Sequence, residues 1–592
     1  MRNYSAQRVE MRCFETVARY PSSRSQSRGR GKHDQPENLS GKERSLQLDD
    51  NALLVLRERY LIRDEAGTLL ETPEELFRRV ACSVSQGENN DPEGRRAEME
   101  EAFYEMMTGL EFLPNSPTLM NAGRPLGQLA ACFVLPVEDS LDSIFDSVKL
   151  TAKIHQTGGG TGFSFSRLRP KNDVVKSTMG VASGPVSFIR VFNCATEAIK
   201  QGGTRRGANM GILRIDHPDI MEFVAIKRDP AELTNFNLSV AITDEFMRSY
   251  EENRDVALIN PRTKKAAGKV NARELLRFIA EAAWASGEPG VIFLDAINRA
   301  NPTPHVGEIE ATNPCGEQPL LPYESCCLGS INLSRIVRNG GIDWQRLQKL
   351  THLGVRFLDD VVEVSTYPSE EIRAMTSGNR KIGLGVMGFA HLLIRLGIPY
   401  DSPDAERTGG EIIRLIERES KIASNRLAEK RGPFPNFKGS VWDRKNLLQR
   451  NATTTTIAPT GTLSILAGTS SGVEPIYDIR YKRILPGGIE VEVEDPLWRK
   501  AKDRPDADEL RRRLFRKAYE VSPFAHLNIQ RTFQSSVDNA VSKTVNLPET
   551  ATADDILDIY VAAYRMGLKG TTVFRNKSRG YQILSCGTHQ IC

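Results

Sequence analysis

The sequence predicts an α/β fold in which parallel strands are joined by crossover helices. From about residue 131 to residue 575, short apolar runs alternate with longer amphipathic runs. The stretches 290–294 and 451–458 are typical of strands, and 275–285 is typical of a helix. This alternation indicates repeated strand–helix–strand units. The 592 residues exceed one simple core, and large α/β barrels are the known exception to that limit.

The composition is that of a soluble globular enzyme. Apolar residues make up 40% of the chain and charged residues 26%. The net charge of +4 is small for this length, so neither a nucleic acid nor a membrane surface is expected as a partner. The chain has no run of about 18 apolar residues, so no membrane-spanning segment is expected.

The cysteine content favours a reducing compartment. The chain has 9 cysteines, an odd number, and no secretory apolar segment leads it. We therefore expect a cytoplasmic protein with catalytic or redox thiols rather than a disulfide framework. The cysteines lie at positions 13, 82, 132, 194, 315, 326, 327, 586 and 592.

The N-terminal part divides into a tail and a helical region. Residues 1–45 are basic and rich in Ser and Arg, which predicts a disordered tail, although an organellar transit peptide has a similar composition. Residues 46–130 form the predicted helical domain, with one helix over 51–60. A second helix opens at Thr72, which suits an N-cap, and Pro73 suits its first position.

Residues 311–319 (Ala-Thr-Asn-Pro-Cys-Gly-Glu-Gln-Pro) carry the strongest chemical signal. Asn313, Cys315 and Glu317 alternate, so in extended chain their side chains would share one face. Pro314 and Gly316 between them suit a tight loop. The site would then have a sulfur that could react, a base beside it and an amide that orients a substrate by hydrogen bonding.

Five further segments accompany this motif, in an order that is typical of one family. They are 115–123, 128–132, 157–162, 203–209 and 459–462. With these segments, the chain resembles ribonucleotide reductases over about residues 46 to 585. The resemblance is closest to the adenosylcobalamin-dependent branch, known as class II.

The resemblance implies a ten-stranded α/β barrel over residues 131–575, with a central finger loop that carries the radical cysteine. The helical region 46–130 precedes the barrel, and residues 576–592 form a mobile tail with redox cysteines. No segment resembles the family's N-terminal ATP-binding activity module, so on/off control by ATP and dATP is not expected.

The family's chemistry assigns a role to each residue of the motif. Cys315 would be the thiyl that takes the 3′ hydrogen of the ribose, Glu317 the base on the 3′-OH, and Asn313 the group that holds the ribose oxygens. Cys132 and Cys326 match the redox dithiol that supplies two electrons. The neighbouring cysteine, 327, is the rival to Cys326, and strand alternation allows only one of the two to face the pocket.

The C-terminal cysteines are expected to re-reduce this dithiol. Cys586 and Cys592 could carry electrons inward by thiol–disulfide exchange, with a thioredoxin-like protein as the external reductant. His589 lies between them, but two cysteines and one histidine make an incomplete zinc set, so no metal site is predicted.

A loop after the strand-like segment 453–458 is expected to bind the substrate phosphates. A strand that ends in a small-residue turn and opens a helix presents backbone N–H groups to an anion. By resemblance, Ser116 and Thr118 also line this site. The residues of the loop are Pro459, Thr460, Gly461 and Thr462.

Two loops match the family's specificity loops, which couple a dNTP or ATP effector site to the choice of substrate base. Asp139, Arg169 and Arg205 stand at effector-binding positions. Asp139 would accept from the deoxyribose hydroxyl, and the arginines would pair with the triphosphate. In the family this site lies at a dimer interface, so we expect a homodimer.

The radical source follows from a missing pair of phenols. Class I enzymes need a radical-generating partner subunit and a Tyr-Tyr pair near the C-terminal end of the barrel. Val573 and Phe574 stand at those positions and cannot relay a proton and an electron. The anaerobic glycyl-radical branch is disfavoured by Glu317 together with a full redox dithiol. The resemblance therefore implies adenosylcobalamin, with a class I-type subunit as the alternative.

Two other interpretations are less favoured. Residues 383–388 fit G-x-G-x-x-G, a dinucleotide-binding pattern, but no buried strand is expected before them, so we predict a close-packed helix segment there. A non-catalytic nucleotide-binding regulator should lack Cys315, Glu317 or a redox cysteine, and all are present. The resemblance favours ribonucleoside diphosphates over triphosphates as substrates.

Overall fold

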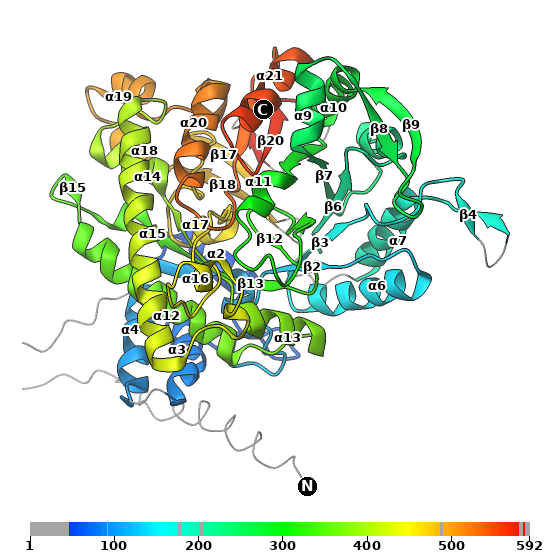
Figure 1. Ribbon diagram of the computed structural model, residues 1–592. Helices are drawn as coiled ribbons and strands as arrows, with labels where there is room; N and C mark the ends of the chain where they lie inside the picture. The colour runs from blue at the N-terminus through cyan, green and yellow to red at the C-terminus, as the bar shows by residue number, and fades with distance from the viewer. Residues whose placement is uncertain are drawn as a thin grey trace, which may run out of the picture.

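A computed structural model describes residues 46–90, 93–175, 179–199, 207–485, 489–578 and 584–586. The predicted tail 1–45, Arg205 and Cys592 lie outside these residues. Figure 1 shows a group of N-terminal helices beside a barrel of strands, with the larger helices arranged around the strands.

The N-terminal region is helical, as predicted, and its caps explain where the helices begin. The Asp49 side chain accepts from the amide of Ala52, and Thr72 forms a capping box with Glu75. Apolar side chains of these helices, such as Phe77, are completely buried. The helices are α2 (Asp50–Arg59), α3 (Pro73–Val84), the 3-10 helix η1 (Ser85–Asn90), α4 (Arg96–Thr108) and α5 (Ser116–Asn121).

The barrel consists of two sets of parallel strands, which we call the first and second half-barrel. The first half-barrel contains β2 (Cys132–Leu135), β3 (Gly160–Ser164), β6 (Asn209–Arg214), β7 (Phe236–Ile242) and β10 (Gly290–Phe293). The second contains β13 (Ser325–Asn332), β16 (Ile382–Met387), β19 (Thr544–Leu547) and β20 (Gly570–Arg575). The half-barrels meet along two antiparallel pairs, β2 with β13 and β10 with β20.

An extended segment, 453–457, closes the ring; we call it the closing segment. It bridges β16 at Leu384↔Thr455 and the residues before β19 at Ile457↔Val541, both in parallel orientation. The amide of Ile457 donates to the carbonyl oxygen of Ala540 at 3.1 Å, which continues the ladder. One sheet contains ten named strands, and β1 (Phe112–Pro114) lies outside the ring on β13. The prediction of a ten-stranded α/β barrel is confirmed, with the closing segment as the tenth strand of the ring.

Crossover helices connect successive strands and cover the outside of the ring (Figure 1). The large ones are α6 (Leu141–Gln156), α7 (Pro185–Ala198), α10 (Ala272–Ser286), α12 (Trp344–Val364), α15 (Pro403–Arg431), α20 (Pro523–Gln534) and α21 (Ala553–Arg565). Shorter ones are α8 (Ile220–Ala225), α9 (Asp244–Glu251), α11 (Leu294–Arg299), α13 (Glu370–Asn379), α14 (Phe389–Leu396), α16 (Val441–Arg444), α17 (Gly461–Leu466), α18 (Pro496–Ala501) and α19 (Ala507–Arg513). The predicted helix 275–285 and strand 290–294 correspond to α10 and β10.

Small sheets extend from this frame. They are β4 (Val174–Val175) with β5 (Gly180–Val181), β8 (Asp255–Ile259) with β9 (Ala266–Asn271), β14 (Val337–Arg338) with β15 (Gly341–Ile342), and β18 (Ile489–Glu494) with β17 (Arg480–Leu485) and β21 (Leu584–Cys586). Tyr481 of β17 is in register with Cys586. For these three tail residues the expected mobile segment is replaced by a strand, since the backbone groups at the edge of β17 can pair with a further strand.

The run 383–388 begins within a strand, so the predicted helix segment is wrong. It contributes most of β16, every residue of which is buried. A side chain at Gly385 would lie 2.2 Å from the carbonyl oxygen of Thr456, and one at Gly383 would lie 2.7 Å from the Thr456 side chain. The glycines therefore allow the closing segment to approach the strand, a requirement that a single-sequence pattern does not separate from helix packing.

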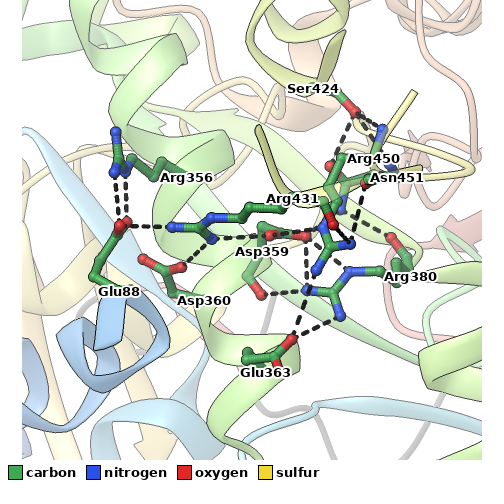
Figure 2. Close-up of polar contacts among 11 residues, drawn as sticks. Glu88, Arg356, Asp359, Asp360, Glu363, Arg380, Ser424, Arg431, Arg450 and Asn451 are labelled. Atoms are coloured by element: carbon green, nitrogen blue, oxygen red, sulfur yellow. Dashed lines mark hydrogen bonds and ion pairs between the residues drawn. The ribbon is translucent and has the colours of Figure 1, made fainter. Parts of the chain in front are cut away.

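A buried ionic network joins the N-terminal helices to the barrel (Figure 2). The Glu88 carboxylate of η1 pairs with Arg356 of α12 and, at 2.6 Å, with Arg431 of α15. Asp359 of α12 pairs with Arg380, which lies just before β16, at 2.8 Å. Burial acts to raise the pKa of Asp359, but the surrounding guanidinium groups outweigh it and hold the pKa at about 2.

Among the described residues, no helix combines the length and the apolar character that a membrane crossing requires.

The close approach at Gly385 predicts a large effect of one methyl group. Gly385→Ala should lower the free energy of unfolding by about 1–3 kcal/mol, because the added carbon overlaps the Thr456 carbonyl. Gly341→Ala is the matched control, since its added carbon would meet no atom closer than 4.0 Å. Urea unfolding of both variants measures the difference, and equal midpoints would contradict the described closure.

Candidate active site

The loop between β11 (Ala311–Thr312) and β12 (Pro319–Leu320) lies against the inside of the first half-barrel; we call it the finger loop. A side chain at Gly162 of β3 would lie 1.7 Å from the carbonyl oxygen of Thr312. The side-chain amide of Asn237 donates to the carbonyl oxygen of Pro314 at 2.8 Å. The loop can occupy this place because glycine on β3 provides the space.

Cys315 is at the turn of the finger loop, where its side chain is exposed to a large cavity. The cavity measures about 580 Å³ and is also lined by residues of β10, β20 and the 459–478 region. This volume is within the usual range of small-molecule sites, roughly 300–1,000 Å³. Of the cysteines whose side chains the structure describes, Cys315 is the one that lines the cavity.

Asn313 and Glu317 lie deeper than the alternation argument predicts. Residues 314–317 form a turn rather than extended chain, so alternate side chains do not share one face. Both side chains are 2% exposed. The Asn313 amide donates to the sulfur of Cys132 at 3.1 Å, which connects the finger loop to β2. The three residues are thus close in the fold, but only Cys315 lines the cavity in this conformation.

Cys132 and Cys326 are directly opposite each other on β2 and β13. Such positions have Cα atoms roughly 4.5–5.5 Å apart, within the range that a disulfide spans. Both side chains belong to a small apolar cluster inside the ring, together with Ala311 and Leu320 of the two strands that flank the finger loop. Cys327 points to the other face and packs in the outer core.

Burial keeps the thiols of Cys326 and Cys327 protonated. Desolvation raises the pKa of Cys326 well above its ordinary value and raises that of Cys327 to about 12. The sulfur of Cys326 donates to the carbonyl oxygen of Lys381 at 3.5 Å. A thiol in this state holds its proton until a substrate or a partner thiol changes its surroundings.

The predicted phosphate loop is at the start of α17, and helix α2 contacts it. Pro459 lines the cavity, and the Thr460 hydroxyl accepts from the amide of Gly472 at 2.8 Å. The guanidinium group of Arg59 donates to the Thr462 hydroxyl at 2.5 Å. Arg59 was missed by sequence reasoning, because nothing in α2 indicates a contact so distant in the chain.

The other predicted substrate residues differ in their surroundings. The Ser116 hydroxyl is 2.8 Å from the hydroxyl of Tyr60, which follows Arg59 at the end of α2. The end of α2 therefore contacts both Ser116 and the predicted phosphate loop. Thr118 is fully buried, and its hydroxyl donates to the carbonyl oxygen of Leu129 at 3.0 Å. In this structure the Thr118 hydroxyl is therefore part of the scaffold.

Two predicted effector residues form an ion pair. The guanidinium group of Arg169 is 2.9 Å from the Asp139 carboxylate, and it also donates to the carbonyl oxygen of Val174 at 3.1 Å. Both side chains of the pair are about a quarter exposed, at 23% and 26%. The structure thus brings Asp139 and Arg169 together, and Arg205 lies outside the described residues.

Polar side chains that sequence reasoning missed line the far part of the cavity. The buried Lys543 ammonium pairs with Glu474 and lies 2.8 Å from Nδ1 of His526. Burial lowers the pKa of Lys543, although Glu474 opposes this effect. The imidazole of His391 is 2.7 Å from the Asp495 carboxylate. Each of these residues is isolated in the sequence, so no motif indicates them.

The two residues predicted to stand at the tyrosine positions of class I enzymes are part of the same cavity. Val573 and Phe574 of β20 both line it, and neither has a hydroxyl group. Tyr477 and Tyr481 lie at its β17 side, with their ring centroids 5.5 Å apart.

Two family models match almost the whole described chain. Residues 130–574 match the family model "Ribonucleotide reductase, barrel domain", and residues 46–127 match "Ribonucleotide reductase, all-alpha domain". The barrel match covers well over half of the chain, so the chain belongs to the ribonucleotide reductase family.

Three relatives show how similar the chain is to individual members of this family. A vitamin B12-dependent ribonucleoside-diphosphate reductase of Mycobacterium tuberculosis is 49% identical, over 92% of this chain and 82% of the relative. The protein of the same name from Thermoplasma acidophilum is 45% identical, over 93% of this chain and 82% of the relative. The ribonucleoside-diphosphate reductase subunit alpha of Chlamydia muridarum is 26% identical, over 90% of this chain and 59% of the relative.

The register of β2 and β13 predicts which thiols form a disulfide. Mild oxidation of the native protein should give a peptide that links Cys132 to Cys326, because these residues are opposite each other. Mass spectrometry of a non-reduced digest detects it. The link should persist in Cys327→Ser and disappear in Cys326→Ser. A peptide that joins Cys132 to Cys327 would contradict the described register.

Proposed function

We propose that the protein is an adenosylcobalamin-dependent ribonucleotide reductase that converts ribonucleoside diphosphates to 2′-deoxyribonucleotides. The observation that carries this proposal is the arrangement of three thiols: Cys315 lines the cavity, and Cys132 is in register with Cys326 behind it. Reduction of a ribose carbon needs both a radical site and a two-electron donor, and this arrangement offers candidates for both.

The reaction balances on the protein's own residues. Cys315, as a thiyl, removes the 3′ hydrogen and later returns it, while Glu317 takes up the 3′-OH proton and Asn313 orients the ribose. The 2′-OH leaves as water. Cys132 and Cys326 supply two electrons and two protons and become a disulfide. One ribonucleotide and one dithiol therefore yield one deoxyribonucleotide, one disulfide and one water.

The cavity beside Cys315 is open enough to admit part of a bulky cofactor. Gly468 lines it with open space where a side chain would stand, and the cavity reaches Cys315. When bound, adenosylcobalamin supplies homolytic cleavage of its Co–C bond as the source of radical chemistry. The residues named in the cavity wall would hold and shield the group, and the names of the B12-dependent relatives support the same cofactor.

The alternatives have less support. A class I-type subunit needs a radical route from a partner, and Val573 and Phe574 provide no phenol for it. A non-catalytic nucleotide-binding regulator would have no use for three thiols and a buried carboxylate in one barrel.

Binding and regulation follow the family pattern in this proposal. Pro459 to Thr462, with Ser116, form the phosphate site; Thr118 supports it from the scaffold, and Arg59 supports it through Thr462. Asp139, Arg169 and Arg205 bind dNTP or ATP effectors at the interface of a homodimer. Cys586 and Cys592 pass electrons from a thioredoxin-like reductant in the cytoplasm, and the pairing of β21 with β17 supports a location for Cys586 beside the cavity.

Anaerobic turnover tests the proposal. With dithiothreitol and no second subunit, CDP should give dCDP only when adenosylcobalamin is present, and dATP or dTTP should change the rate. CTP in parallel decides between the diphosphate and the triphosphate. Cys315→Ser should abolish product, because an alcohol does not replace the thiyl, whereas Cys327→Ser should retain activity. Product without the cobalamin, or product from Cys315→Ser, would refute the assignment.

A further inference from the structure

The finger loop is held at Glu317 through its backbone. The carbonyl oxygen of Glu317 accepts from the amide of Ala540 and from the hydroxyl of Thr456, each at 2.9 Å. Thr456 belongs to the closing segment, and Ala540 follows a turn before β19. Because both donors meet one carbonyl, they fix the orientation of that peptide and thus the direction of the Glu317 side chain.

The turn at 538–539 is tied to the closing segment by side chains. The Asp538 carboxylate accepts from the amide of Thr454 at 2.6 Å and pairs with the Lys421 ammonium. Asn539 donates to the carbonyl oxygen of Thr455 at 3.1 Å. Burial acts to raise the pKa of Asp538, but Lys421 outweighs it and the pKa lies below its ordinary value.

The buried ammonium of Lys569, the residue directly before β20, completes this arrangement. Lys569 is 8% exposed, and its Nζ donates to the carbonyl oxygens of Asp538 at 2.6 Å and Asn539 at 2.5 Å. Hydrogen bonds from a charged donor are shorter and stronger than neutral ones. Burial lowers the pKa of Lys569 to about 8, so the side chain is still an ammonium at neutral pH.

We propose that Lys569 is a positioning residue for the finger loop: it holds the 538–539 turn, and this turn holds the backbone of Glu317. The inference rests on the proposed function, in which Glu317 acts on the substrate. Lys569 is not among the described residues that line the cavity. Its effect on turnover is therefore transmitted through the turn. It should therefore alter the chemical step more than substrate binding.

Kinetics of three variants test the role. Lys569→Met keeps the length of the side chain and removes the donor, and Lys569→Arg restores a charged donor. Arg356→Met is the control for the loss of a buried cation, because the Arg356 side chain is 14% exposed and pairs with Glu88 of η1, and neither residue lines the cavity. A misplacement of about 1 Å can cost on the order of 100-fold in rate. We expect Lys569→Met to lose about 10- to 100-fold in kcat for CDP, with KM changed less than about threefold.

The other variants separate a positioning role from a merely structural one. Lys569→Arg should regain a large part of kcat, and Arg356→Met should retain kcat even if it melts at a lower temperature. A wild-type kcat for Lys569→Met would overturn the proposal, as would an equal loss in Arg356→Met. If Lys569→Met does not fold, Lys569→Gln, a shorter neutral donor, replaces it; an intermediate kcat supports the proposal and a wild-type kcat overturns it.

Hydrogen exchange separates this inference from the proposed function. In Lys569→Met, the amide of Ala540 and the finger-loop amides of Gly316 and Gln318 should exchange faster than in the wild type, and in Arg356→Met they should not. Unchanged exchange in Lys569→Met would overturn the inference whether or not the enzyme turns over. Failure of the wild type to produce dCDP would refute the proposed function alone, because the exchange result is independent of catalysis.

Discussion

The close contact of peptide groups inside the ring is the constraint on which the rest of the structure depends. The finger loop passes β3 where a side chain at Gly162 would lie 1.7 Å from a backbone oxygen. The closing segment passes β16 in the same way, since a side chain at Gly385 would lie 2.2 Å from the carbonyl oxygen of Thr456. These two approaches bring the loop into the barrel and complete the ring around it. The exposure of Cys315 to the cavity therefore depends on two positions that have no side chain.

The ionic network in Figure 2 connects this interior to the N-terminal helices. Asn451 donates to the Asp359 carboxylate at 3.0 Å and to the carbonyl oxygen of Arg380 at 3.1 Å, directly before the closing segment begins. Buried ion pairs often add little net stability, because the charges lose their hydration. Their effect here is to fix where Glu88, Arg380 and Asn451 lie relative to one another, and with them the entry of two adjacent strands.

Local signals in the sequence predicted local structure well. The Thr72 cap, the helix at 275–285 and the strand at 290–294 could be predicted because their interactions are short in range. The strand at 383–387 could not, since its glycines serve a neighbour more than 70 residues later in the chain. The family motif indicated Cys315, Cys132 and Cys326, but not that the turn would bury Asn313 and Glu317.

Long-range contacts of isolated polar residues account for most of what was missed. Arg59 approaches Thr462 across 403 residues, and Lys569 approaches Asn539 across 30 residues. Neither residue belongs to a recognisable pattern, because its partner is a single hydroxyl or a main-chain oxygen. Such contacts form only when the barrel has closed, so no local pattern predicts them.

The position of the cysteine pair gives the barrel a mechanical property. Cys132 and Cys326 are on β2 and β13, one of the two places where the half-barrels meet in antiparallel orientation. A disulfide there would act as a covalent staple between the half-barrels, while the opposite junction, β10 with β20, would remain joined by hydrogen bonds alone. A crosslink between residues so distant in the chain also restricts the unfolded ensemble. The stiffness of the barrel would then alternate with its oxidation state, once in every catalytic cycle.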